Sequence, residues 1–98
     1  MIGRIWRGVI RTGDTGEYVE YVRETGIEHY RSVPGNQGAW ILTRPLGETT
    51  EILTFSLWDS MAAVKAFAGE DPSRAVYYPE DDRYLVERGE TVDHYEVG

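Results

Sequence analysis

The sequence has 98 residues, a net charge of −7 at pH 7 and no cysteine. This length predicts one domain over residues 1–98, and the absence of thiols excludes disulfides, thiol catalysis and thiolate metal sites. The negative charge argues against nucleic acid or an anionic membrane as a partner. Without a signal-peptide core or a membrane-spanning run of roughly 18 apolar residues, we expect a cytoplasmic protein.

The first predicted element is a strand over residues 2–11, where apolar residues alternate imperfectly. Trp6 and Ile10 fall on one side of this strand, and Ile5 and Val9 fall on the other. Its three arginines are expected near the strand ends or reaching outward to water: Arg4, Arg7 and Arg11.

A helix is predicted over residues 14–32. Its stripe consists of Tyr18, Val22, Thr25 and His29, which follow one another at helical spacing. We expect this stripe to face a sheet, which would place His29 at the end of a cleft.

Two further strands are predicted over residues 38–44 and 50–58, joined by a hairpin loop as an antiparallel pair. The second is a nearly continuous apolar run, which is typical of a strand buried on both faces. Either Asp59 or Ser60 can cap the helix that follows, and Gly69 is a plausible end for that helix.

Residues 72–88 are expected to be irregular, with one or two helical turns, and residues 91–97 to form the last strand. The order βαββαβ predicts an α+β, ferredoxin-like domain with both helices on one sheet face. The other face would be apolar and open, holding either Trp58 or Phe55 and Leu57. Because exposing such a face is disfavoured, we expect association through it.

Two histidines and a tyrosine are candidate catalytic residues: His29, His94 and Tyr77. A histidine in a cleft is the natural proton acceptor near neutral pH, and a neighbouring phenol can relay the proton. The alternative is structural, with one histidine capping a helix and the other facing solvent or a partner.

Aromatic side chains could line a pocket for a flat, partly hydroxylated aromatic molecule: Trp6, Trp40, Phe67, Tyr77, Tyr78 and Tyr84. Ordinary core packing is the alternative, and it is favoured for Trp6 and Trp40. The carboxylates of Glu80, Asp81 and Asp82 predict a solvated loop rather than a metal site, so no metal is expected.

Several segments resemble the antibiotic-biosynthesis-monooxygenase group of dimeric α/β-barrel proteins. They are Trp-Asp-Ser (58–60) before AVKAFAGED, the early RIWRG and the ending HYEV. The resemblance implies a homodimer in which two sheets close into one barrel. In the cofactor-independent branch, which oxidises anthrones to quinones, an Asn and a Trp correspond to Ala63 and Phe67. An arginine of that branch could correspond to Arg83 or Arg88.

In the heme-degrading branch, an Asn, a Trp and a ligating His correspond to Trp6, Phe67 and Tyr77 of this chain. Although tyrosinate can ligate heme iron, replacement of the whole set argues against heme degradation.

The resulting hypothesis is a cofactor-free, monooxygenase-like protein acting on a flat aromatic or polyketide-type molecule. His29 or His94 would remove a proton, the carbanion would react with oxygen, and tyrosines or Arg83 would stabilise the oxyanion. One alternative is a non-catalytic, ligand-binding barrel, and another is a cyclase or isomerase that uses no oxygen. Oxygen consumption would distinguish the monooxygenase from the cyclase or isomerase, and any turnover would distinguish both enzymes from the binding protein.

Overall fold

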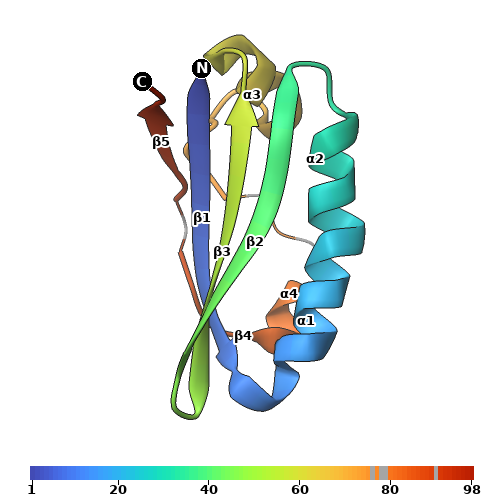
Figure 1. The fold of residues 1–98 in the computed structure, drawn as a ribbon. Helices are drawn as coiled ribbons and strands as arrows, with labels where there is room; N and C mark the ends of the chain where they lie inside the picture. The colour runs from blue at the N-terminus through green and yellow to red at the C-terminus, as the bar shows by residue number, and fades with distance from the viewer. Residues whose placement is uncertain (76, 78–79, 90) are drawn as a thin grey trace.

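The computed structural model describes residues 1–75, 77, 80–89 and 91–98. One antiparallel sheet contains five strands: β1 (Ile2–Arg11), β2 (Asn36–Leu46), β3 (Thr49–Trp58), β4 (Leu85–Arg88) and β5 (Asp93–Glu96). The order across the sheet is β2-β3-β1-β4, and β5 also pairs with β1 (Figure 1). This is the predicted ferredoxin-like α+β arrangement, with an open sheet in the single chain.

A continuous helical rod covers one face of the sheet (Figure 1). It follows a short turn, η1 (Thr12–Asp14), and consists of α1 (Thr15–Val22), the π-helical turn η2 (Arg23–Ile27) and α2 (Glu28–Ser32). The predicted helix over residues 14–32 is therefore present, but a π turn interrupts it.

The π turn changes which side chains face the sheet. It adds one residue to the helical turn, so the stripe that begins with Tyr18 and Val22 continues through the buried Gly26, with the half-buried Thr25 beside it. Tyr30 then takes the position expected for His29, and the side chain of His29 is exposed. The prediction that His29 faces the sheet is wrong for this reason.

The central strand β3 is buried on only one face within this chain. Its residues alternate without interruption, and the buried ones, which include Ile52 and Trp58, face the helical rod. Phe55 and Leu57 lie half-buried on the open face, where Trp40 of β2 stacks on Phe55 at 5.8 Å between ring centroids. The expectation of a strand buried on both faces is corrected, and the open face holds Phe55 and Leu57 rather than Trp58.

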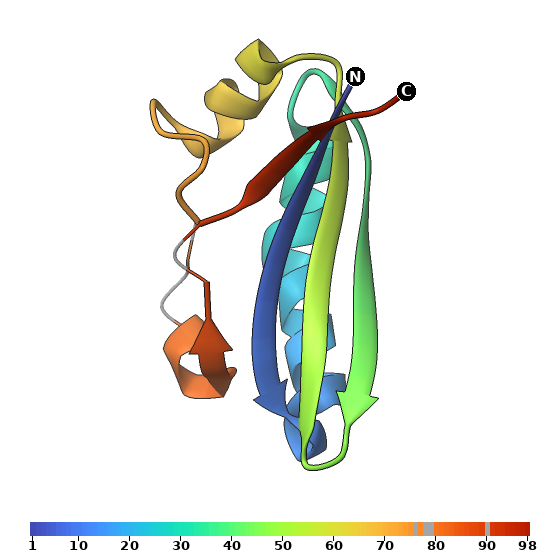
Figure 2. The same ribbon diagram turned by 90° about the vertical axis from the view of Figure 1, so that its left-hand side faces the viewer.

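The helix α3 (Met61–Ala68) begins and ends as predicted. The Ser60 hydroxyl accepts a hydrogen bond from the Ala63 amide at 3.3 Å, and Gly69 ends the helix with a φ of 90°. Figure 2 shows α3 at the end of the sheet near both termini, with the following segment running down beside the sheet. Phe67 anchors α3 there by stacking on Trp58 at 5.7 Å.

The segment over residues 72–88 contains the predicted helical turn, α4 (Asp81–Tyr84), and also β4, which the sequence did not predict. β4 is four residues long and mostly exposed, so it carries no alternating pattern. It pairs with the Gly8–Ile10 part of β1, while β5 pairs with the Ile2–Ile5 part.

Candidate functional site

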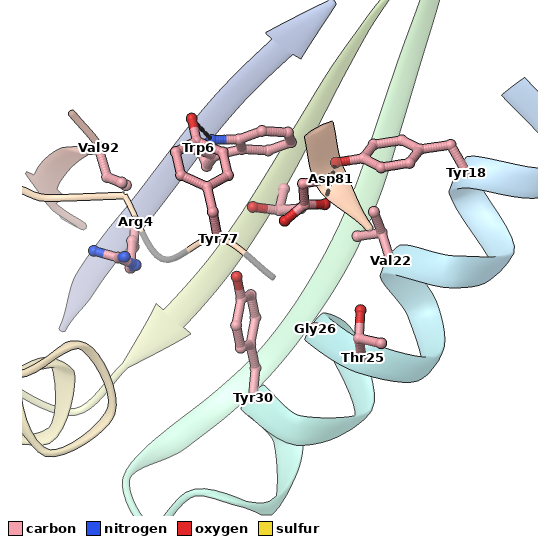
Figure 3. A pocket seen from close by; sticks show the side chains of 11 residues that line it. Arg4, Trp6, Tyr18, Val22, Thr25, Gly26, Tyr30, Tyr77, Asp81 and Val92 are labelled. Carbon is pink, nitrogen blue, oxygen red and sulfur yellow. Dashed lines mark hydrogen bonds between the residues drawn. The ribbon is translucent and has the colours of Figure 1, made fainter. Parts of the chain in front are cut away.

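A pocket lies between the sheet, the helical rod and the segment after α3 (Figure 3). The hollow spans about 410 Å³ when the open solvent at its mouth is included. Its walls are largely aromatic, formed by Trp6, Tyr18, Tyr30 and Tyr77. Charged groups also line it, namely the guanidinium of Arg4 and the carboxyl group of Asp81. Such a combination is typical of a small-molecule site.

The alternation of β1 places Arg4 and Trp6 on the pocket side, because residues two apart on a strand share a face. Gly8 continues this row and makes room for the indole. A Cβ atom at Gly8 would lie 2.6 Å from Cη2 of Trp6, closer than carbon atoms approach. The missing side chain therefore lets the Trp6 ring lie against the strand.

Trp6 and Tyr77 are held together by a hydrogen bond and by ring packing. The indole Nε1 donates to the Tyr77 hydroxyl at 3.1 Å, and the rings meet edge to face at 6.1 Å between centroids. The same hydroxyl donates to the carbonyl of Gly89. The Arg88 guanidinium lies 4.7 Å from the centroid of the Tyr77 ring. These contacts give the pocket a rigid aromatic wall.

Arg4 is a buried cation, with 4% of its surface exposed. Its Nη1 donates to the carbonyl of Pro72 at 2.6 Å and lies 3.0 Å from Nε2 of His94. The ion pairs among the described residues do not include Arg4. Burial lowers the pKa of Arg4, opposed by the nearby Tyr30. The expectation that Arg4 reaches outward is wrong, whereas Arg7 and Arg11 are exposed as expected.

His94 is the uncharged partner of Arg4. Arginine has no acceptor atom, so Nε2 of His94 must accept this hydrogen bond and the neutral ring carries its proton on Nδ1. Burial and the positive charge of Arg4 lower the pKa of His94, while Asp93 has the opposite effect. His94 therefore does not line the pocket itself but contacts Arg4, which does.

A second buried charge lies across the pocket, beyond Tyr77 as seen in Figure 3. The Tyr18 hydroxyl donates to Oδ1 of Asp81 at 2.9 Å, and 5% of the surface of Asp81 is exposed. Burial and the charge of Asp81 raise the pKa of Tyr18. The prediction of a solvated loop is therefore wrong for Asp81, although Glu80 and Asp82 are exposed. Asp81 points inward because α4 packs Tyr84 on Tyr18, with ring centroids 5.2 Å apart.

Some predicted site residues meet at this pocket. Trp6 and Tyr77 line it, and Phe67 lies beneath Arg4, whose guanidinium is 5.7 Å from the ring centroid. Tyr84 is buried behind Tyr18. Tyr78 lies outside the described residues.

The structure places other predicted residues away from the pocket. Trp40 is 45% exposed on the open sheet face. His29 is exposed on α2, with its ring 5.5 Å from that of Phe67. Arg83 is exposed and pairs with Glu80 at 3.4 Å.

Sequence reasoning missed several residues that line the pocket: Arg4, Tyr18, Tyr30 and Asp81. Alternation on β1 could have found Arg4, which lies two residues before Trp6. The stripe of the first helix could have found Tyr18. The acidic run in the sequence carries no sign that Asp81 alone is buried.

The donor atoms at the pocket do not fit heme. The described residues that line it include no histidine, and the Tyr77 hydroxyl is already engaged with Trp6 and Gly89. Elsewhere in the described ranges, no three His, Asp or Glu side chains lie close enough together to hold a metal ion. Across the same ranges, no helix is both long and apolar enough to cross a membrane.

No protein-family model matches the sequence, and no curated protein matches it. Solved structures do resemble it. A protein from Nitrosomonas europaea that is described as a putative antibiotic biosynthesis monooxygenase has a TM-score of 0.69 at 19% identity, covering 99% of this chain and 98% of that one. The corresponding protein from Bacillus cereus has a TM-score of 0.61 at 16% identity, covering 96% and 87%.

The heme degrader MhuD from Mycobacterium tuberculosis, solved with two hemes bound in its active site, is also similar. Its TM-score is 0.58 at 20% identity, covering 99% of this chain and 95% of that one. At these identities, the likeness shows that the chain has the fold of antibiotic-biosynthesis-monooxygenase proteins. Activity does not follow from a shared fold.

Proposed function

We propose that this protein binds a flat, hydroxylated aromatic molecule in the pocket and oxidises it with molecular oxygen by acid–base chemistry. One observation carries the proposal, namely that a buried guanidinium, Arg4, and a buried carboxyl group, Asp81, line the same aromatic-walled pocket. Charged groups are costly to bury, and such pairs of groups gather at functional sites.

The substrate that suits these groups is an anthrone-type ketone, whose ring CH₂ group is acidic. Asp81 accepts a proton from this group, and the electron pair left behind delocalises onto the ring oxygen next to Arg4. The carbanion gives two electrons to O₂ and bonds to one of its atoms, forming a hydroperoxide after protonation. Loss of water breaks the O–O bond, so CH₂ and O₂ become C=O and H₂O.

Other residues position these two groups. Tyr18 holds Asp81 through its hydroxyl, and His94 holds Arg4. Trp6 and Tyr77 supply a flat surface on which an aromatic ring can pack. His29 has no part in this scheme, so the base expected from the sequence and the base proposed from the pocket can be told apart by mutation.

Oxygen uptake with an anthrone, measured for Asp81→Asn and His29→Ala, tests the proposal. If Asp81 is the base, Asp81→Asn lowers kcat/KM by roughly 10²-fold or more and His29→Ala leaves it unchanged. The reverse pattern, in folded variants, would assign the base to His29 instead. Product formation at an undiminished rate without oxygen would show a cyclase or isomerase, and tight binding without turnover would show a binding protein.

We also propose that two copies pair through the open sheet face. Large apolar side chains are exposed there, with Trp40 45% and Leu42 50% exposed and Phe55 half-buried between strands. A small domain rarely leaves such a face in water, so a second copy of the same face would cover it.

A further inference from the structure

We propose that the pocket takes its ligand as an oxyanion, so that its substrates are hydroxyarenes acidic enough to ionise when they meet Arg4. This inference rests on the pocket being the substrate site. Beyond the proposed function, it specifies that the ligand binds as an anion and that Arg4 recognises its negative charge.

The first step concerns the missing counter-ion of Arg4. Both hydrogen bonds that its guanidinium makes with described residues start from Nη1, and both acceptors, Pro72 O and His94 Nε2, are uncharged. A buried cation is stable only when paired or well hydrogen-bonded. An anionic oxygen on the ligand would supply the charge that the described residues do not place there.

The second step concerns the residue opposite Arg4. His94 stands directly across from Arg4 in the β1–β5 register. The acidic neighbour Asp93 pairs with Ile5 and so points to the other sheet face, while Glu96 is exposed opposite Ile2. The strand therefore presents a neutral ring to Arg4 and turns its nearest carboxylate away. A carboxylate at position 94 would pair with Arg4 and compete with an anionic ligand.

The third step concerns orientation. Arg4 and Asp81 lie on opposite sides of Tyr77 in the pocket (Figure 3). An oxyanion is attracted to Arg4 and repelled by Asp81, so a flat anion between the aromatic walls has one favoured direction. Ionising a ring hydroxyl and removing the CH proton of its keto form give the same delocalised anion. Arg4 therefore stabilises the same anion that Asp81 forms by removing the CH proton of the keto form, and this anion is the electron-rich form that reacts with O₂.

The test uses 4-nitrophenol, whose two protonation states differ in colour, and the neutral ether 4-nitroanisole. Binding is followed by calorimetry, and ionisation of the bound phenol is followed by absorbance across pH. We expect the phenolate to bind roughly tenfold more tightly than the protonated phenol, which lowers the pKa of the bound ligand. We also expect 4-nitroanisole to bind no better than the protonated phenol.

Two variants assign the preference to Arg4. Arg4→Gln removes the charge, and His94→Asp keeps Arg4 but gives it an internal partner, so each should reduce phenolate affinity roughly tenfold and leave 4-nitroanisole unchanged. Arg83→Gln, an exposed arginine away from the pocket, is the matched control and should bind as the unmodified protein does. If Arg4→Gln fails to fold, His94→Asp alone decides the question.

Equal affinity for phenolate and ether, or an undiminished preference in His94→Asp, would overturn the inference. Because 4-nitrophenol has no CH₂ group to oxidise, this result is independent of turnover. Failure of the oxygen assay would therefore count against the proposed function alone.

Discussion

Arg4 and His94 face each other across neighbouring strands, and Nη1 of Arg4 donates to Nε2 of His94 over 3.0 Å. The hydrogen bond exists only while the imidazole is neutral, because a protonated ring has no acceptor. It joins the buried cation of the pocket to a residue whose pKa is lowered by burial and by Arg4, so the pocket should respond to acid.

The first prediction is a loss of stability in acid that depends on His94. Burial and Arg4 lower the pKa of His94 below its ordinary value of 6.5, so the unfolded chain takes up this proton before the folded one. The stabilising contribution is therefore complete above pH 6.5 and is lost as the pH falls toward the folded pKa. Denaturant unfolding from pH 7.5 to pH 5 should show a steeper loss for the natural chain than for His94→Gln. Parallel curves would contradict this.

The second prediction concerns the buried pair Tyr18 and Asp81. Tyr18→Phe removes the donor to a buried carboxyl group and should lower the free energy of unfolding by about 1–3 kcal/mol. A double-mutant cycle with Asp81→Ala separates this pair from its surroundings. We expect a coupling energy of about 0.5–3 kcal/mol, and simple additivity of the two changes would show that the hydrogen bond contributes nothing.

The third prediction concerns the space above Gly8. A methyl group there would meet the Trp6 ring at 2.6 Å and Cδ2 of Leu85 at 2.9 Å. Gly8→Ala should therefore cost about 1–3 kcal/mol of stability through overpacking. Gly13→Ala is the matched control, since a Cβ atom at Gly13 has nothing within 4 Å. Equal melting temperatures for the two variants would be inconsistent with the packing described.

The fourth prediction is a homodimer that depends on the open sheet face. Light scattering should give twice the mass of one chain at micromolar concentration, and Trp40→Lys should shift the protein toward monomer. An interface above about 1,000 Å² would suit such a contact. Glu28→Lys, an exposed change on the helical rod, should leave the mass unchanged. A monomer at this concentration would rule the dimer out.

The fifth prediction is weak heme binding without degradation. The pocket residues that the structure describes offer no imidazole, and the Tyr77 hydroxyl is committed to hydrogen bonds. Titration with heme should give no sharp Soret shift. Tight binding followed by heme loss in the presence of a reductant would show that Tyr77 leaves its partners to act as a ligand.

The sequence by itself determined the local elements and their order. Alternation sorted the residues of β1 between two sheet faces, Ser60 and Gly69 bounded α3, and the hairpin followed from two apolar runs around turn residues. These features depend on neighbours in the chain, so the periods of strand and helix reveal them. Trp6 and Tyr77 line a pocket in the structure, although the sequence favoured ordinary core packing for Trp6.

Only the tertiary structure decided which charged and titratable groups belong to that pocket. The π turn has no recognisable sequence pattern, and it places Tyr30 instead of His29 on the side of the helix that faces the sheet. The packing of α4 buries Asp81. Pairing of β1 with β5 set Arg4 against His94, residues separated by most of the chain. Burial of a charge depends on contacts between distant segments, whereas hydrophobic periodicity records only which face of an element is apolar. That difference is why the fold was visible in the sequence and the charged centre of the pocket was not.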